Sequence, residues 1–377
     1  MTFSRAFPLA KSLPASKTLR LIYFLTSAII LTTLTTNNAH AWQAKKVADG
    51  LTLPWGVTYI NESTLLITER GGAIKQLNLK TGQHQTLFQV PNVSVKGQGG
   101  LLDIANSPFA ENTLYFTYSK DINGQGATAL ASAIYENGKL NHWQDILVTQ
   151  SRSDTGRHFG SRITFDNNSV YFSIGDRGVR DNGQNTQTHA GSILRLTPSG
   201  QVPSDNPFLN NNKVRNEIWS YGHRNPQGLF FDNKTNQLWS IEHGPRGGDE
   251  INLIKKGANY GWPITSHGQE YWGPISVGEA KEKQGIESPV KVYVPSIAPG
   301  SLVLYRGDKF PELNGKLLAG ALKLMHINVV TLNQAGEAVD EQRLLEDLNE
   351  RIRDIETSPA GDIYFVTDSG NLYQLTR

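Results

Sequence analysis

Short apolar runs separated by polar turns make up most of this chain. Seven of the runs are rich in Val, Ile, Leu, Tyr, Phe and Thr and are bounded by Gly, Asn, Asp or Pro, which is typical of β-strands. These runs are Thr64–Thr68, Thr113–Tyr118, Ser169–Ile174, Gln237–Ile241, Ser301–Tyr305, Lys316–Ala321 and Asp362–Thr367. No long amphipathic helix pattern occurs, and the one stretch that favours a helix, around Glu341–Leu348, is short. The pattern therefore predicts an all-β fold.

A weak internal repeat indicates how these strands are arranged. Its copies are TLLITERGGAIKQL from Thr64, LWSIEHGPRGGDEINL from Leu238 and IYFVTDSGNLYQL from Ile363, with SVYFSIGDRG from Ser169 as a looser copy. Each consists of an apolar strand, a turn with an acidic residue and Gly, and a second strand. Hairpins that recur along a whole chain are typical of a β-propeller, and the length fits about six four-stranded antiparallel blades. A pair of β-sandwiches is the alternative.

The first 41 residues have the features of a secretory signal peptide. Four basic residues precede an apolar run over 21–34, and Ala-His-Ala at 39–41 follows, which is the order found before a signal cleavage site. A membrane anchor is the alternative, but the apolar run is shorter than the ~20 residues of a spanning helix. We therefore expect a periplasmic protein with no stable membrane insertion after cleavage. No Pro- or Ser-rich linker divides residues 42–377, so we expect one propeller domain there.

Composition narrows the classes of function. The signal carries 4 of the 36 Lys and Arg and no acidic residue, so the mature chain has 36 − 4 = 32 basic against 34 acidic residues, a formal charge of −2. Nothing in this balance favours nucleic acid or an anionic membrane as a partner. The chain has no cysteine, which excludes disulfides, thiolate catalysis and Cys-ligated zinc or iron–sulfur clusters.

His158 and Asp176 are candidates for acid–base chemistry. His158 lies in RHFGSRITF, where a polar loop meets an alternating strand, and imidazole titrates near neutral pH, as a general base requires. Asp176, in SIGDRG, is a candidate partner that would fix the tautomer of the ring. The alternatives are a surface or hydrogen-bonding histidine and an ordinary turn aspartate.

Cationic side chains lie in several of the predicted turns and strand ends. Arg224 and Asn225 share a turn-rich stretch, and Lys323 ends a strand. Arg351 and Arg353 are two residues apart on a probable strand and so face the same side. Four cations on separate turns repel one another unless an anion lies between them, so they favour a polyanionic small ligand. Scattered surface charges are the alternative.

Two further stretches supply groups for binding. Gln98 lies in GQGGLLDIA, where the glycines leave room for a flat ligand or simply form a turn. Gly244 and Pro245 place two carbonyl groups on a constrained turn, and Glu250 and Tyr260 follow. Hard cations such as Ca²⁺ take oxygen ligands of this kind, although the spacing is not that of an EF-hand.

Taken together, these segments resemble the soluble PQQ-dependent aldose sugar dehydrogenases of the glucose/sorbosone dehydrogenase family. The motifs that carry the resemblance run in order along nearly the whole mature chain: LPWGV, GQGGLLD, HFGSR, SYGHRNPQG, EHGPRGGDEINLI, NYGWP, SIAPGS, RIRDI and IYFVTDSGNLYQL. The resemblance implies a six-bladed propeller that binds pyrroloquinoline quinone (PQQ), a flat tricarboxylate, in its central channel.

The resemblance also implies a role for each candidate residue. His158 would take the proton of the anomeric hydroxyl while C1 passes a hydride to the quinone, and Arg224 with calcium would stabilise the charge that grows on the quinone oxygen. The cofactor would be held by Gln98, Arg224, Asn225, Lys323, Arg351 and Arg353. The carbonyl groups of Gly244 and Pro245 would bind the calcium at the quinone, and Glu250 with Tyr260 a second, structural calcium. The sugar would become a lactone, and an external acceptor would take the electrons.

The sequence constrains the substrate range and the oligomeric state less than it constrains the fold and the cofactor. Val294 precedes SIAPGS, where some members of the family place an aromatic residue against the sugar, and the loop between His158 and Arg224 is short. We therefore expect a broad range of aldoses. The alternatives to a dehydrogenase are a calcium-dependent propeller lactonase or esterase and a non-catalytic sugar-binding propeller. The sequence leaves monomer and homodimer open.

Overall fold

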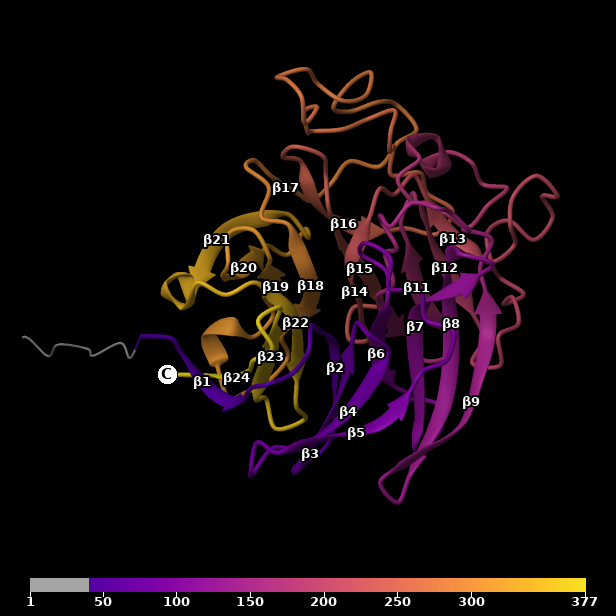
Figure 1. Cartoon of the computed structure of the whole chain (residues 1–377). Coiled ribbons are helices and arrows are strands. Elements are labelled where there is room, and N and C mark those ends of the chain that lie inside the picture. The colour runs from indigo at the N-terminus through magenta and orange to yellow at the C-terminus, as the bar shows by residue number, and fades with distance from the viewer. Residues whose placement is uncertain (1–40) are drawn as a thin grey trace, which may run out of the picture. The chain divides into compact units, whose positions relative to one another are not determined.

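Twenty-four strands form six antiparallel sheets in residues 41–377, the part of the chain that the structure describes. The structure is a computed structural model, and the predicted signal peptide lies outside the described residues except for Ala41. Each sheet has four strands, which confirms the predicted all-β class and the four-stranded antiparallel blades (Figure 1).

Five blades are built from consecutive strands. The first contains β2 (Pro54–Asn61), β3 (Thr64–Glu69), β4 (Ala73–Asn78) and β5 (His84–Gln89). The second contains β6 (Leu101–Asn106), β7 (Thr113–Ile122), β8 (Gln125–Glu136) and β9 (Lys139–Val148). The third contains β10 (Ile163–Phe165), β11 (Val170–Ile174), β12 (Ser192–Leu196) and β13 (Ile218–Tyr221). The fourth contains β14 (Pro226–Asp232), β15 (Gln237–Glu242), β16 (Asp249–Ile254) and β17 (Lys291–Tyr293). The fifth contains β18 (Pro299–Leu304), β19 (Leu317–Ala321), β20 (Ile327–Leu332) and β21 (Ala338–Leu344).

The sixth blade joins the two ends of the described chain. It contains β22 (Ile352–Thr357), β23 (Ile363–Thr367) and β24 (Leu372–Thr376), and its outermost strand is β1 (Gln43–Ala48). Three short 3₁₀ turns complete the elements: η1 (Arg180–Gly183), η2 (Pro311–Leu313) and η3 (Glu346–Leu348).

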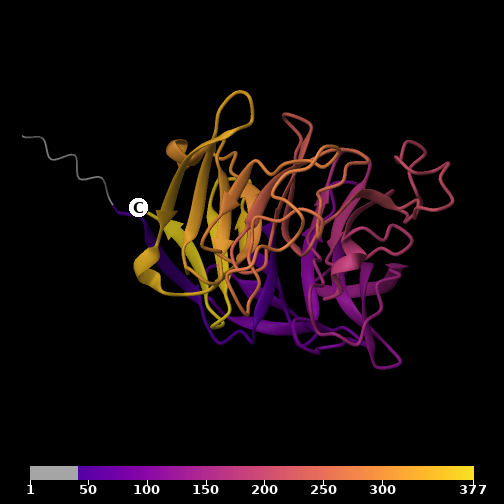
Figure 2. The same cartoon turned by 90° about the horizontal axis from the view of Figure 1, so that it is seen from above.

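The first strands of the six blades face the centre and contact one another in a closed ring. Contacts run from β2 through β6, β10, β14 and β18 to β22, and β22 in turn contacts β2. The indigo strands β1 and β2 accordingly lie beside the yellow strands β22 to β24 (Figures 1 and 2). The ring confirms a six-bladed propeller and excludes the pair of sandwiches.

Apolar side chains fill each of the six blade interfaces. In β3, Leu65 and Ile67 pack against the sixth blade, whereas Leu66 points the other way into the second blade. A second strand is therefore buried on both faces, which explains why these strands read as continuous apolar runs and not as alternating ones. The repeated hairpin of the sequence is the second and third strand of a blade.

Most of the innermost strands begin with a β-bulge. The register shifts lie between Pro54 and Val57, Leu101 and Ile104, Pro226 and Gly228, Pro299 and Ser301, and Ile352 and Asp354. A bulge re-aims side chains and is common beside active sites. The bulges mark the end of the channel at which the innermost strands begin.

The helix expected around Glu341–Leu348 is wrong. Its first half belongs to β21, which pairs with β20 from Ile327↔Leu344 to Leu332↔Ala338, and only Glu346–Leu348 form a 3₁₀ turn. The ladder to β20 outweighs the local helical preference of Glu, Gln, Arg and Leu. Within the described residues, no helix is long and apolar enough to cross a membrane.

Candidate active site

A cavity of about 250 Å³ opens at the bulged end of the channel. Its wall is made by the loops that lead into the innermost strands and by the turns between second and third strands. The lining residues are Trp55, Arg70, Gln98, Leu102, Phe159, Gly160, Asn225, Gln227, His243, Ala298, Leu322, Arg351, Arg353 and Asp368. Arg70, His243 and Asp368 belong to three copies of the repeated turn, so the repeat contributes directly to this cavity.

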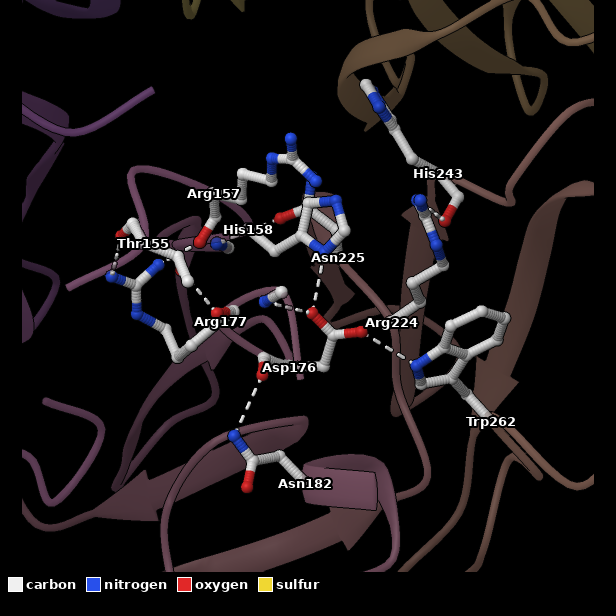
Figure 3. A network of polar contacts seen from close by, with 12 residues as sticks. Thr155, Arg157, His158, Asp176, Arg177, Asn182, Arg224, Asn225, His243 and Trp262 are labelled. Atoms are coloured by element: carbon white, nitrogen blue, oxygen red, sulfur yellow. Dashed lines mark hydrogen bonds and ion pairs between the residues drawn. The ribbon is translucent and has the colours of Figure 1, made fainter. Parts of the chain in front are cut away.

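His158 and Asp176 form a hydrogen-bonded pair beside the cavity. Nδ1 of His158 lies 2.6 Å from Oδ1 of Asp176, which is the contact expected of an orienting partner (Figure 3). The two residues after His158, Phe159 and Gly160, line the cavity. An ionised carboxylate only accepts, so Nδ1 carries the proton and Nε2 is the acceptor. No residue in the range 41–377 forms a hydrogen bond to that Nε2.

The surroundings keep the imidazole of His158 neutral. Burial lowers the pKa of His158 below its ordinary value, and the positive charge of Arg224 adds to this, while the hydrogen bond to Asp176 acts in the opposite direction. A histidine with a lowered pKa is uncharged at neutral pH and is able to accept a proton.

Three donors fix the carboxylate of Asp176. Besides His158, the Gly178 N–H donates to Oδ1 at 2.7 Å and the Trp262 indole donates to Oδ2 at 2.8 Å (Figure 3). Burial acts to raise the pKa of Asp176, but the hydrogen bonds from His158 and Gly178 outweigh it, and the pKa lies below its ordinary value. The group therefore remains a charged acceptor.

Gln98 and Asn225, both predicted to bind a cofactor, also hold the loop of the base. Oε1 of Gln98 accepts the backbone N–H of His158 at 2.8 Å, and Oδ1 of Asn225 accepts that of Gly160 at 3.1 Å. Both side chains line the cavity. The loop that carries His158 and the wall of the cavity are thus one hydrogen-bonded unit.

Arg224 is positioned by Glu242 but keeps an unused donor. Oε2 of Glu242 accepts the backbone N–H of Arg224 at 2.7 Å, and Nη1 of Arg224 donates to the His243 carbonyl at 3.1 Å. Nη2 lies 3.5 Å from the hydroxyl of Tyr271. Nε is buried and has no hydrogen-bond partner among the described residues. A buried donor without a partner is unfavourable, so this atom favours a bound acceptor.

Three guanidinium groups line the main cavity. Nε of Arg351 and Nε of Arg353 bind the two oxygens of Asp368 at 2.8 and 2.9 Å, which confirms that both side chains face the same way. One carboxylate offsets only one of these two charges. Arg70 adds a third cation, and its guanidinium has no hydrogen bond or ion pair to any residue of 41–377. A flat anion with several carboxylates, such as PQQ, fits this wall.

The sequence missed part of this wall. The chemistry-based reading of the sequence does not identify Arg70, Trp55 or Asp368, although Arg70 and Asp368 follow the same strand of the repeat as Asp176 does, and aligning the repeats brings them out. Lys323, which the sequence predicts to bind the cofactor, is exposed, and its neighbour Leu322 lines the cavity. The role of Lys323 in binding stays a prediction.

The four residues predicted to bind calcium all line one smaller cavity. Gly244, Pro245, Glu250 and Tyr260 surround a volume of about 20 Å³, and His243 lies in the walls of both cavities. The phenol of Tyr260 is already engaged, since it donates to a carbonyl at 2.6 Å and accepts an N–H at 2.8 Å. Only the backbone oxygen of Tyr260 is left for a metal.

Oxygen atoms in this smaller cavity suit a hard cation. Burial raises the pKa of Glu250 to about 8, and the negative charge of Glu242 adds to this. Asn252 does not line the cavity, but its amide nitrogen pairs with both of these carboxylates, and its Oδ1 is buried without a partner in the described chain. Residues 41–377 contain no group of three or more His, Asp or Glu that could hold a metal. A calcium ion here would depend on amide and backbone oxygens as well as carboxylates.

The loop that follows the smaller cavity brings aromatic residues to the site. Tyr271 reaches Arg224 as described above, and Trp272 beside it is 75% exposed. The preceding Glu270 anchors the loop through two contacts of 2.7 Å to the guanidinium of Arg180. Nothing in the repeat points to these residues, because the repeated hairpin ends with β16, before this loop begins.

The chain is similar to known proteins over nearly all of its described length. Residues 51–374 match the family described as Glucose / Sorbosone dehydrogenase. The aldose sugar dehydrogenase YliI of Escherichia coli is 38% identical over 340 residues, which cover 87% of this chain and 91% of that protein. The quinoprotein glucose dehydrogenase B of Acinetobacter calcoaceticus is 27% identical over 413 residues, which cover 87% of this chain and 86% of that protein.

Solved structures agree with these matches. The apo-form of the soluble aldose sugar dehydrogenase from Escherichia coli has a TM-score of 0.84 and 36% identity, and covers 89% of this chain and 99% of its own. The PQQ-bound form of the aldose sugar dehydrogenase from Streptomyces coelicolor has a TM-score of 0.74 and 26% identity, and the match covers 89% of this chain and 97% of that one.

Proposed function

The chain belongs to the glucose/sorbosone dehydrogenase family, and on that premise we propose that it oxidises aldose sugars at C1 to lactones, with PQQ as its cofactor. The observation that carries the proposal is the His158–Asp176 pair, 2.6 Å apart, beside a cavity lined by three arginines. An oriented base next to a cationic cavity suits a dehydrogenation with an anionic acceptor. The PQQ-bound structure of a relative supports the choice of cofactor.

His158 is the proton acceptor in this proposal. Its Nε2 takes the proton of the C1 hydroxyl, because Nδ1 is committed to Asp176 and the lowered pKa keeps the ring neutral. Asp176 holds the ring orientation and stabilises the imidazolium that forms. The N–H groups that fix Asp176 keep it ionised throughout.

Cofactor binding is assigned to the charged wall of the main cavity. The residues of this wall that would hold PQQ are Gln98, Asn225, Arg351 and Arg353, with Arg70 as an addition from the structure, and Lys323 would approach from beside Leu322. When bound, PQQ would supply the two-electron acceptor for the C1 hydride. Arg224, with its unpaired Nε, would be a fixed cation for the negative charge that develops.

Calcium is assigned to the smaller cavity beside Arg224. The carbonyl groups of Gly244 and Pro245 would bind an ion that acts as a Lewis acid at the cofactor, and Glu250 with the Tyr260 carbonyl would bind a structural ion. The adjacent carboxylates of Glu242 and Glu250, and the raised pKa of Glu250, support a cation at this place.

We expect a broad aldose range, because Val294 is 71% exposed and offers no aromatic ring to close the sugar site. We also propose a periplasmic location, from the predicted signal peptide, and an external electron acceptor.

The experiment that tests the function is reconstitution of the purified apo-protein. Calcium and PQQ are added, and reduction of an artificial dye is followed with a panel of aldoses, with His158→Ala as the matched variant. We expect sugar-dependent dye reduction by the wild type, and a loss of about 10²–10⁴-fold in the variant with cofactor binding retained. Absence of sugar-dependent reduction and of any spectral change in the cofactor would refute the proposal. Lactone hydrolysis by the calcium-loaded protein without PQQ would favour a lactonase instead.

A further inference from the structure

One arginine lies at the centre of the propeller and contacts every blade. Arg162 immediately precedes β10 in the third blade and is 4% exposed. Its guanidinium reaches the innermost strands of the other five blades. The partners are Trp55, Asp103, the Gln227 carbonyl, the Gly300 carbonyl, the Arg353 carbonyl and Asp354.

The contacts are short and use every nitrogen of the guanidinium. Nη1 lies 2.7 Å from Asp103 and 2.9 Å from Asp354. Nε donates to the Gln227 carbonyl at 2.9 Å, and Nη2 donates to the carbonyl groups of Gly300 and Arg353 at 2.8 and 3.0 Å. The ring centroid of Trp55 is 4.1 Å from the guanidinium carbon. A planar fork of five N–H donors is required for such a set, and lysine does not supply one.

Arg162 lies between two cavities of the channel. Trp55, Gln227 and Arg353 line the main cavity described above. Asp103, Asp354 and Arg162 itself line a second cavity of about 230 Å³, formed further along the innermost strands. The guanidinium therefore forms the partition between them, and three of its six partners belong to the proposed cofactor site.

Stability alone does not account for this arrangement. Asp103 and Asp354 also accept the backbone N–H groups of Ile163 and Val57, at 2.8 and 2.9 Å, and so join neighbouring blades independently of the arginine. A buried ion pair is a weak source of stability compared with apolar packing, whereas it does fix geometry. What Arg162 adds is the position of the Trp55 ring and of the Arg353 main chain.

We propose that Arg162 is a positioning residue for the cofactor cavity, setting the Trp55 ring and the Arg353 backbone against which a flat polyanion is held. The inference rests on the proposed function, since it concerns the same site. It predicts that loss of the fork loosens cofactor binding and displaces the cofactor from His158, without removing any group that touches it.

The test compares Arg162→Lys with Arg195→Lys. Arg195, on β12, is also buried, lies 4.9 Å from the ring centroid of Trp219 and binds Asp205 at 2.7 Å, but it lines neither cavity. Binding of PQQ to calcium-loaded apo-protein is measured by titration, together with turnover at saturating PQQ and the unfolding temperature. We expect R162K to raise the PQQ dissociation constant about tenfold and to lower turnover about ten- to hundredfold, because the groups that hold the cofactor are displaced from their positions. R195K should lower only the unfolding temperature.

Equal PQQ affinity and turnover in R162K and wild type would overturn the inference while leaving the proposed function intact. If wild type itself does not bind PQQ, the proposed function fails and the inference falls with it. Should R162K not fold, Asp354→Asn decides, because it retains Arg162 and an acceptor for the Val57 N–H but replaces the oxygen that binds the guanidinium with an NH₂ group. An unchanged PQQ dissociation constant in D354N would then contradict the inference.

Discussion

The carboxylate of Asp176 has a donor on each oxygen and cannot turn without losing one. His158 and Gly178 share Oδ1 at 2.6 and 2.7 Å, and Trp262 holds Oδ2 at 2.8 Å. The ring of His158 is thereby fixed through a partner that is itself fixed. Orientation of the base thus depends on Asp176 as much as on the histidine.

The Asp176→Asn substitution should therefore reduce turnover strongly. An amide offers one acceptor and one donor group, so either His158 or Trp262 would face an NH₂ group, and the negative charge that stabilises the imidazolium is lost. We expect turnover to fall about 10²–10⁴-fold with PQQ binding retained. Asp166→Asn is the control, because Asp166 accepts three hydrogen bonds within its own turn and from Tyr171, away from the cavity. If D176N turns over as fast as D166N, the assignment of Asp176 as the residue that orients His158 is contradicted.

The pH dependence of the reaction should report the lowered pKa of His158. The base is active when neutral, so kcat/KM should rise with pH through a midpoint below 6.5, the ordinary histidine value, and then level off. The measurement is kcat/KM for one aldose from about pH 4.5 to 8. His158→Ala should lack this midpoint in its residual rate. A midpoint above 7 in the wild type would show that another group controls the reaction.

At the residue scale, the sequence predicted groups with distinctive chemistry better than groups defined by position. His158, Asp176, Arg351 and Arg353 carry charge or titrate near neutral pH, and the structure brings each of them to the site. Arg162 could not be identified in this way, because a single sequence does not distinguish an arginine buried at the centre of the propeller from one on the surface.

At the element scale, two loops of the third blade meet through glycine. Gly175 follows β11 directly, and a Cβ atom placed there would lie 2.4 Å from the carbonyl oxygen of His158 and 2.9 Å from Oδ1 of Asn225. Only a residue without a side chain permits this approach. The turn after β11 therefore supports the loop that carries the base, and glycine at 175 is part of how the site is shaped.

Gly175→Ala should accordingly damage the site more than the fold. The added methyl group must displace the backbone of His158, so we expect about 1–3 kcal/mol lower stability from overpacking. We also expect turnover to fall about tenfold or more, because the base moves from its position. The control is Gly71→Ala, after the corresponding strand of the first blade, where a Cβ meets nothing within 4 Å. Denaturant unfolding and steady-state kinetics measure both effects, and wild-type turnover in G175A would show that the loop adapts.

Elements buried on both faces were the most predictable part of the fold. The second strands read as continuous apolar runs and were all placed correctly, as in Thr64–Glu69 and Ile363–Thr367. Outer strands were harder, since they expose one face and carry helix-forming residues. β21 is the example: the helix expected there was wrong because pairing with β20 is a long-range interaction that local propensity does not contain.

At the scale of the whole molecule, the ring is closed by the N-terminal strand. β1 pairs with β24 from Gln43↔Thr376 to Ala48↔Leu372, and Trp42 packs against Phe310 at 5.3 Å between ring centroids. The sequence predicted the number of blades from the repeat but not this closure, because QAKKVA has too few apolar residues to read as a strand. Cleavage at the predicted position after Ala41 would leave β1 intact.

The second cavity of the channel concentrates carboxylates on the side of Arg162 away from the proposed cofactor site. Asp103, Asp354 and Glu356 line it together with a single cation, Arg162. Burial raises the pKa of Glu356 to about 8; the neighbouring Asp354 and Asp103 act in the same direction, and the hydrogen bond from the Tyr59 N–H opposes them. Because the folded protein binds this proton more tightly than the unfolded chain, the contribution of Glu356 to stability is lost as pH rises from about 5 through 8.

The Glu356→Gln substitution should remove this loss of stability at high pH. The amide oxygen still accepts the Tyr59 N–H, and the side chain no longer ionises, so the variant should match wild type near pH 5 and exceed its stability at pH 9. We expect a gain of about 1–3 kcal/mol at pH 9, since water at the partly exposed carboxylate reduces the full effect. Glu111→Gln, at an exposed position, controls for the change in net charge. Urea unfolding from pH 5 to 9 gives the difference, and a constant gap between E356Q and wild type would mean that Glu356 ionises normally in the folded propeller.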